Sequence, residues 1–179
     1  MSTFVALLRG INVGGKNVLP IRELASDLRA LGLENVRTYI QSGNAVFEVT
    51  GSVSKTLPAK ISARIEERHG FRSQVLIRSS AELQTAVDAN PFPEAESNPK
   101  TLHVFFLASE VPSPDVALLD AAKSPSERFV LGDRVFYLHA PNGVARSKLA
   151  ANTEKYLGVP VTARNWRIVQ KLLEMTRAT

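Results

Sequence analysis

Apolar and polar positions along this chain follow two alternating periods. Runs with period two predict β-strands, while apolar residues three and four apart predict helices. In the first helical pattern, Pro20 suits the first position and Gly32 suits the stop. In the first half we expect strands at residues 3–10, 36–41, 44–49 and 73–79, and helices at 20–32, 54–69 and from Ser79 to before Asn90.

The same order of elements recurs in the second half, at an offset of about 98 residues and with little sequence identity. There we expect strands at residues 101–108, 126–132, 134–140 and 159–164, and helices at 113–124, 145–158 and 165–175. The pattern predicts an α+β protein of two tandem ferredoxin-like (βαββαβ) subdomains with antiparallel sheets. We place these subdomains at residues 1–90 and 100–179, joined by a proline-rich connector at residues 91–99.

Two polar, glycine-bearing loops follow strands of the first subdomain. GINVGGKN (residues 10–17) comes after the first strand, and SGN (residues 42–44) comes after the second. In a βαββαβ sheet these two strands run the same way, so their C-terminal ends lie at one edge. We therefore expect both loops at that edge.

GINVGGKN differs from a nucleotide-binding P-loop, G-x-x-x-x-G-K-[ST], in its last position, where Asn17 replaces a hydroxyl residue. Three residues also separate Lys16 from Pro20, so this lysine cannot lie in the first helical turn as P-loop chemistry requires. No later strand ends in an acidic residue suited to magnesium. The loop is not predicted to be a P-loop NTPase site.

A turn of this composition can still bind an anion. Gly14 and Gly15 can adopt positive φ and present successive amides, with Lys16 and Arg9 close by. We predict a phosphate-bearing or other anionic ligand bound by Arg9, Gly14, Gly15, Lys16, Ser42 and Asn44. The alternative is a surface loop that needs glycine only for its turn, with a solvated lysine.

Composition narrows the classes of function that remain possible. Hydrophobic residues make up 44% and charged residues 22%, which predicts a packed core, and the net charge of +5 favours anionic partners such as a phosphorylated small molecule or nucleic acid. There are no cysteines, and the three histidines have no metal-ligand spacing. We expect no metal, no cofactor, no membrane partner and a cytoplasmic location, and no enzymatic reaction is assigned.

The motifs LLRGINVGGKN, TYIQSGN and TARNW (residues 162–166) resemble those of the bacterial domain-of-unknown-function family 1697, across essentially the whole chain. The resemblance implies paired α+β subdomains and supplies no catalytic role. It adds Asn12, Arg164 and Asn165 to the candidate ligand-binding residues. Arg164 could meet a phosphate or carboxylate in bidentate fashion.

Two other functions stay open. Ferredoxin-like sheets can bind RNA through exposed aromatic residues, and Phe136 with Tyr137 would serve, although the surrounding residues do not match the RNA-binding signature. A structural or protein-interaction domain is the other alternative.

We expect Trp166 to be a buried anchor. We also expect the two halves to pack together and to bring Lys16 and Arg164 toward one cleft.

Overall fold

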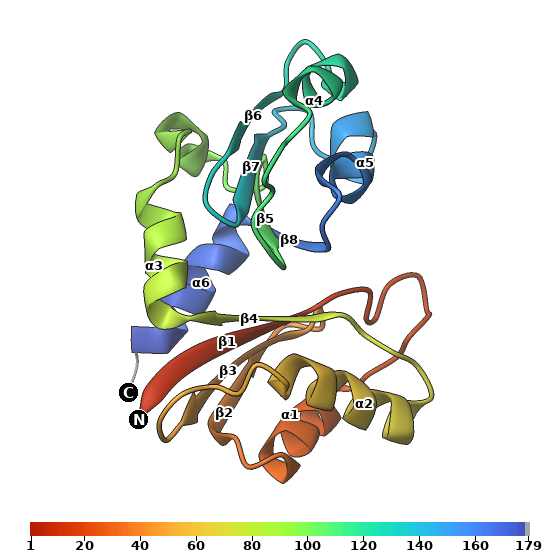
Figure 1. The fold of residues 1–179 in the computed structure, drawn as a ribbon, viewed down its shortest axis with the longest axis vertical. Coiled ribbons are helices and arrows are strands. Elements are labelled where there is room, and N and C mark those ends of the chain that lie inside the picture. Colours follow the sequence, from red (N-terminus) through yellow and green to blue (C-terminus); the bar gives the residue numbers. More distant parts are fainter. Residues whose placement is uncertain (178–179) are drawn as a thin grey trace. The chain divides into compact units, whose positions relative to one another are not determined.

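The computed structural model describes residues 1–177, and the order of its elements is the one predicted from the sequence (Figure 1). The first half contains β1 (Ser2–Leu8), α1 (Ile21–Ala30), β2 (Glu34–Tyr39), β3 (Asn44–Val49), α2 (Leu57–His69), β4 (Val75–Ser79) and α3 (Ser80–Asp88). A short 3₁₀ helix (Pro93–Ser97) follows. The second half contains β5 (Leu102–Leu107), α4 (Val116–Ala122), β6 (Arg128–Leu131), β7 (Val135–His139), α5 (Lys148–Leu157), β8 (Val161–Asn165) and α6 (Trp166–Arg177).

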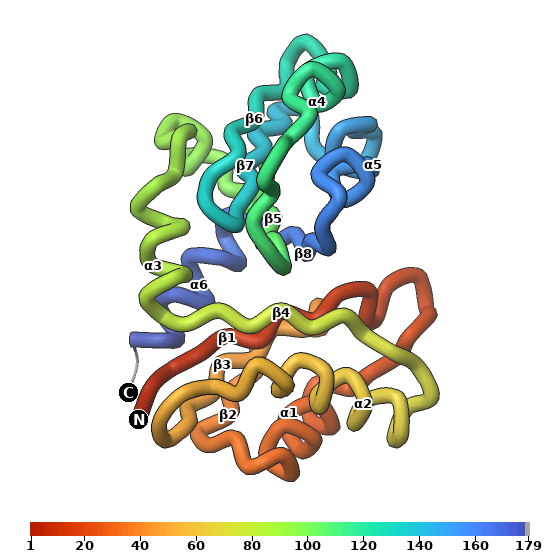
Figure 2. The backbone as a smooth tube through the Cα atoms, in the orientation of Figure 1, coloured from red at the N-terminus to blue at the C-terminus, as the bar shows by residue number. Residues whose placement is uncertain are grey.

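The strands form two four-stranded sheets, ordered β2-β3-β1-β4 and β6-β7-β5-β8. Each pair of neighbouring strands is antiparallel. The α+β class and the two antiparallel sheets are therefore confirmed. Because β1 and β2 are both antiparallel to β3, they run in the same direction and end at the same edge, and the segment after β1 extends beyond the sheet there (Figure 2).

Helices α1 and α2 cover one face of the first sheet (Figure 1). Leu24 and Leu28 on α1, and Ile61 and Ile65 on α2, recur at helical spacing and are buried against strand residues such as Phe47. Burying side chains of this size contributes about 1.5–3 kcal/mol each, which is why the apolar stripe read from the sequence becomes the core face.

In the second half, α4 and α5 pack on the second sheet in the same manner. Leu119 of α4 and Leu149 of α5 are fully buried with Phe136 and Leu138 of β7. The rings of Phe105 and Phe136 meet edge to face, with centroids 5.6 Å apart, an arrangement that aromatic pairs favour. Each half thus has its own hydrophobic core.

The chain divides into two compact units. The first comprises residues 1–84 together with the C-terminal segment from Leu172, and the second comprises residues 85–171. Helices α3 and α6 each contribute to both units. Within the first unit, Ser80 Oγ donates to Thr176 Oγ1 at 3.0 Å, which ties the beginning of α3 to the end of α6.

The 3₁₀ helix of the connector is attached to the second unit. Arg128 of β6 pairs with Glu94 and lies over the ring of Phe92, 4.9 Å from its centroid. It also lies 3.1 Å from Nδ1 of His139. These contacts fix the NPFP segment against the β6–β7 hairpin.

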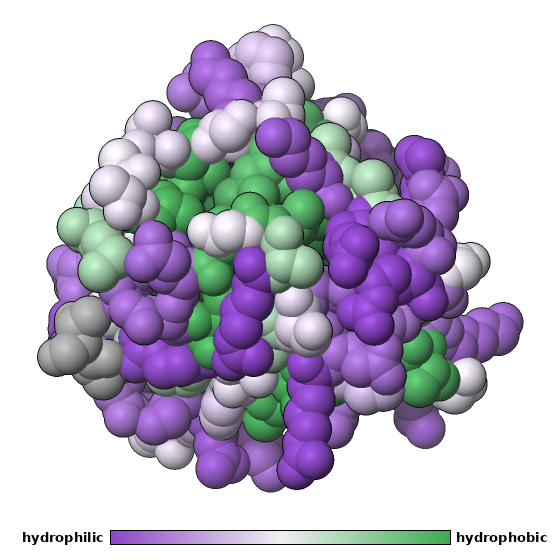
Figure 3. All heavy atoms as spheres, turned by 90° about the horizontal axis from the view of Figure 1, so that it is seen from below, coloured by the Kyte–Doolittle hydropathy of each residue, from purple (hydrophilic) through white to green (hydrophobic). Residues whose placement is uncertain are grey.

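The face drawn in Figure 3 is covered mostly by hydrophilic side chains, with apolar residues in the recesses between them. Within residues 1–177, no helix combines the length and apolar character needed to cross a membrane.

Candidate functional site

The GINVGGKN segment forms a small β-hairpin beyond the end of β1. Val13 and Lys16 form an isolated antiparallel bridge, with Lys16 N donating to the Val13 carbonyl at 3.0 Å. Gly14 and Gly15 have φ of 57° and 72°, as predicted. Two successive positive φ angles define a tight hairpin turn that glycine adopts at little steric cost.

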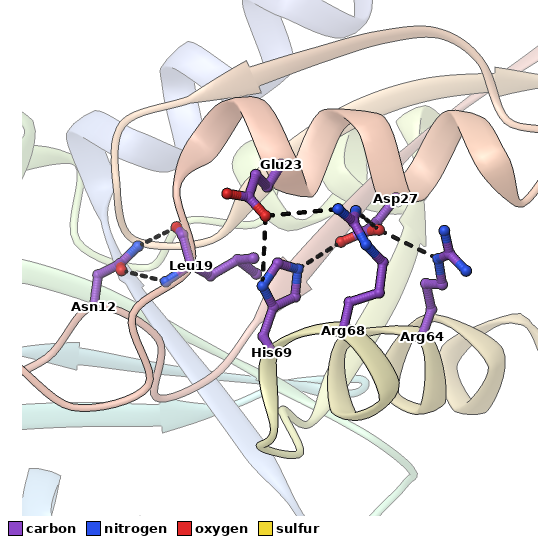
Figure 4. Close-up of polar contacts among 7 residues, drawn as sticks. All are labelled: Asn12, Leu19, Glu23, Asp27, Arg64, Arg68 and His69. Atoms are coloured by element: carbon purple, nitrogen blue, oxygen red, sulfur yellow. Dashed lines mark hydrogen bonds and ion pairs between the residues drawn. The ribbon is translucent and has the colours of Figure 1, made fainter.

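Two asparagines brace this hairpin from inside the loop. Asn12 donates from Nδ2 to the Leu19 carbonyl at 2.9 Å, and its Oδ1 accepts from Leu19 N at 2.8 Å (Figure 4). The same Nδ2 also donates to the Gln41 carbonyl at 2.7 Å. Asn17 donates from Nδ2 to the Gly10 carbonyl at 2.9 Å. Both asparagines have positive φ, 53° and 50°, which Asn tolerates better than most residues. Asn12 therefore connects the GINVGGKN loop to the loop that contains SGN.

The SGN loop lies at the same edge, as its place after β2 predicts. Gly43 accepts from Leu8 N at 2.8 Å and has a φ of 78°. Asn44 is fully buried, and its Nδ2 donates to Ser42 Oγ (2.9 Å) and to the Tyr39 carbonyl (3.1 Å). Its amide group thus stabilises the β2–β3 hairpin from within, and Ser42 remains nearer the surface.

Arg9 is exposed at the end of β1. Its backbone amide donates to the Gln74 carbonyl at 2.9 Å, and its Nη1 donates to Gln74 Oε1 at 3.3 Å. Ser73 Oγ donates to the Arg9 carbonyl at 2.8 Å. Arg9 therefore joins the start of the GINVGGKN loop to the segment before β4, and its guanidinium lies at the surface.

Lys16 and the neighbouring glycines are the least engaged groups of the loop. All three residues are exposed, and nothing lies within 4 Å of the position of a Cβ on either glycine. Among the described residues, the Lys16 ammonium and the amides of Gly14 and Gly15 have no hydrogen-bond partner. Helix α1 begins only at Ile21, so Lys16 lies outside its first turn, as the spacing in the sequence predicted.

Arg164 and Asn165 belong to the second unit. Arg164 Nη1 donates to Thr162 Oγ1 (3.0 Å) and to the Ala163 carbonyl (2.8 Å), and burial lowers the pKa of its guanidinium to about 10. Asn165 Oδ1 accepts from Ile168 N at 3.0 Å, which caps α6. The expected burial of Trp166 is confirmed. The cleft between Lys16 and Arg164 stays a prediction.

Ile40, in the loop between β2 and β3, has an unusual backbone conformation. Its φ is 47°, and its side chain is 46% exposed. A positive φ is strained for a β-branched residue, and such strain concentrates at functional loops. This strained loop lies at the same edge of the first sheet as the GINVGGKN hairpin and the SGN turn.

We expect Ile40→Asn to raise the free energy of unfolding by about 0.5–1 kcal/mol, because Asn accepts this conformation at lower cost. Urea denaturation of the variant and the parent protein measures the difference. Val18→Asn, at an exposed position without a positive φ, is the control and should produce no such gain. Equal effects of the two substitutions would show that Ile40 is unstrained.

A polar network that the sequence did not reveal joins α1 and α2 (Figure 4). Asp27 is 1% exposed and pairs with Arg68, with Arg64 Nε at 3.3 Å and with His69 Nε2 at 2.9 Å. Glu23 completes the network, 3.7 Å from Arg68 and 3.6 Å from His69. His69 is the last residue of α2, and its ring nitrogens face the two carboxylates.

Opposing effects determine the pKa of Asp27. Burial alone would raise it, but hydrogen bonds from Arg68 and His69, together with their charges, hold the pKa of this carboxyl below its ordinary value of 3.8. Asp27 is therefore a charged, buried group whose role is to hold two helices together.

The remaining candidates offer no catalytic arrangement. Phe136 and Tyr137 are buried, and the Tyr137 hydroxyl donates to the Ala86 carbonyl at 2.7 Å, so neither ring is available to stack on a base. Burial lowers the pKa of His103. Within residues 1–177, no group of three His, Cys, Asp or Glu side chains is arranged to hold a metal ion.

Comparisons with known proteins identify a family and a solved structure to which the chain is similar. A family model described as "Protein of unknown function (DUF1697)" matches residues 1–137, a range that includes both glycine-bearing loops. The chain is also similar to the solved structure of conserved bacterial protein SP0830 from Streptococcus pneumoniae, with 27% sequence identity, a TM-score of 0.66 and 98% of each chain covered. No curated protein matches it. The resemblance seen in LLRGINVGGKN and TYIQSGN is thus confirmed, and the chain belongs to the DUF1697 family.

Proposed function

We propose that this protein binds a small anionic ligand, of the phosphate-bearing class, at the tip of the residue 12–17 hairpin. The observation that carries the proposal is a braced hairpin that leaves two successive amides, of Gly14 and Gly15, and the ammonium of Lys16 without partners among the described residues. Exposed donors of this kind, held in fixed positions, suit the oxygens of a phosphate.

The surrounding residues have supporting roles in this proposal. Arg9 adds a second positive charge at the end of β1, and Ser42 adds a hydroxyl from the neighbouring loop. Asn12 and Asn44 hold the two loops in position through the hydrogen bonds described above. Fixing the loops before the ligand arrives reduces the conformational entropy that binding must offset.

We further propose that the chain consists of two ferredoxin-like subdomains, near residues 1–90 and 100–179, which are joined by the connector at residues 91–99 and are defined by element order along the chain. The order β2-β3-β1-β4 and its repetition as β6-β7-β5-β8 support this assignment. In such a sheet the loops after the first and second strands share one edge. Arg164 and Asn165 would extend the site only if the second unit contributes to it.

The test uses pyrophosphate as the probe in a thermal-shift measurement, because a ligand that binds only the folded state raises the melting temperature. We expect pyrophosphate to stabilise the parent protein, and the double substitution Arg9→Ala and Lys16→Ala to abolish that shift with little change in melting temperature without ligand. Lys60→Ala, on the exposed side of α2, removes a positive charge elsewhere and should leave the shift intact.

A shift that persists in the double variant would refute the proposed site. A nucleic acid would be distinguished by its salt dependence, since binding of an oligonucleotide weakens steeply as counterions compete. Binding of a short single-stranded oligonucleotide at low salt, without any response to pyrophosphate, would favour the nucleic-acid alternative.

A further inference from the structure

A hollow lies at the beginning of β2, in the first unit. Its volume is about 770 Å³, and its lining includes Arg29, Leu33, Asn35, Val36, Arg37 and Glu48. It shares no residue with the glycine-bearing loops. Volumes of this size are typical of small-molecule sites.

The backbone of β2 is irregular at this hollow. The pairing of β2 with β3 shifts register between Glu34 and Arg37, and Asn35 in this interval has a φ of 47°. β2 is also an edge strand of its sheet. Bulges of this kind redirect side chains and are common beside binding sites.

Glu48, on β3, is the unexplained group of the hollow. It is 3% exposed, and its Oε2 accepts from Asn35 Nδ2 at 2.8 Å. Its other oxygen, Oε1, is buried and has no hydrogen-bond partner among the described residues. A buried carboxylate oxygen without a donor is costly and therefore rare, so a missing partner is the natural explanation.

The other residues that line the hollow indicate which chemical groups that partner has. Arg37 pairs with Val46 across the sheet, which places it on the same face of the sheet as Glu48, two residues further along β3. Arg29 donates from Nη2 to the Val36 carbonyl at 3.1 Å. Leu33 and Val36 belong to the core beside α1, are each 6% exposed and form the apolar border of the hollow.

We infer that this hollow binds a small zwitterion of the class of an apolar free α-amino acid. The ligand's ammonium group donates to Glu48, its carboxylate meets the guanidinium groups of Arg37 and Arg29, and its side chain contacts Leu33 and Val36. Each ligand group then has a protein counterpart, and the buried oxygen of Glu48 gains the donor that it lacks.

The experiment measures L-leucine binding to the full chain by calorimetry, with two analogues that each lack one charge. We expect L-leucine to bind, N-acetyl-L-leucine to bind much more weakly because it has no ammonium, and L-leucinamide to be weakened because it has no carboxylate. Glu48→Gln should raise the Kd for L-leucine about tenfold or more, the usual scale for one charge-assisted hydrogen bond.

Glu67→Gln, at an exposed position on α2, is the matched control and should leave the Kd unchanged. Arg37→Gln, at the edge strand, provides a second variant if Glu48→Gln does not fold. It should weaken L-leucine but not L-leucinamide. The inference is overturned if millimolar L-leucine gives no binding heat, or if Glu48→Gln and Arg37→Gln both bind L-leucine like the parent protein. Either result leaves the hairpin proposal unaffected, because the two sites share no residue.

Discussion

Replacing Asp27 by alanine is expected to lower the free energy of unfolding by about 3 kcal/mol, the scale for removing one partner of a buried charge network. Asp27 accepts from Arg64, Arg68 and His69, which lie on a helix far along the sequence. Without the carboxylate, three cationic or polar groups lose their common acceptor at the α1–α2 contact. The two arginines are about one-third exposed and can turn to water, so the effect should not exceed this scale.

Urea denaturation followed by circular dichroism measures the change, and amide hydrogen exchange in α1 and α2 localises it. Asp120→Ala is the matched control: this aspartate is 51% exposed and pairs with Lys123 at 2.8 Å. Exposed pairs contribute about 0–1 kcal/mol, so the control should change stability little. Equal losses for the two variants would contradict the role given to Asp27.

The pH dependence separates charge from packing at Asp27. Its pKa in the folded protein lies below the ordinary value of 3.8, so its ionised form contributes stability fully above that value. The contribution is lost as the pH falls through the folded pKa. The difference between the parent protein and Asp27→Ala should therefore shrink at strongly acidic pH.

The regular elements could be read from the sequence because short-range signals coincide with the core. The helix predicted from Ser79 begins with a capping box, with Ser79 N donating to Glu82 Oε2 at 2.7 Å and Glu82 N donating to Ser79 Oγ at 3.1 Å. The helix predicted from residue 54 begins later, at Leu57, because Ser54 and Thr56 form a local side-chain turn before it. Boundaries depend on such local hydrogen bonds more than on periodicity.

The second strand was predicted to run through residue 41, and it ends at Tyr39. Ile40 explains the difference: a β-branched residue favours a strand, yet here it adopts a positive φ in the hairpin loop. The conflict between propensity and conformation could not be read from composition. It arises where the SGN loop turns back toward the GINVGGKN hairpin.

The candidate loops were found from sequence because glycine and asparagine in a tight cluster signal a turn, and topology brings the two turns to one edge. Asp27 and Glu48 were missed for a different reason. Each is a single carboxylate within a regular element, and its meaning depends on tertiary packing: the bonds to Asp27 come from residues 64–69, and Glu48 is distinguished by an oxygen that lacks a partner. No sequence motif indicates the bonds to Asp27 or the missing partner of Glu48.

Gly43→Ala is expected to destabilise the protein by about 3 kcal/mol, combining the strain of a left-handed residue with overpacking. The added Cβ would lie 2.8 Å from Leu8 Cβ and 2.9 Å from Ile11 Cδ1. Both neighbours are buried, and Leu8 Cβ is fixed to its backbone, so β1 or the loop would have to shift. The shift would also strain the Leu8–Gly43 hydrogen bond.

Gly51→Ala provides the matched control for this substitution. Gly51 has a comparable φ of 85°, but nothing lies within 4 Å of the Cβ position, so only the backbone strain of about 1 kcal/mol is expected. Urea denaturation of both variants gives the difference, and their thermal response to pyrophosphate reports on the hairpin. Because Gly43 precedes Asn44 in the SGN loop and its carbonyl accepts from Leu8 N at the end of β1, its replacement should reduce the response while Gly51→Ala preserves it. Equal destabilisation by the two substitutions would show that the loops tolerate displacement and that their close contact is not what holds the hairpin in place.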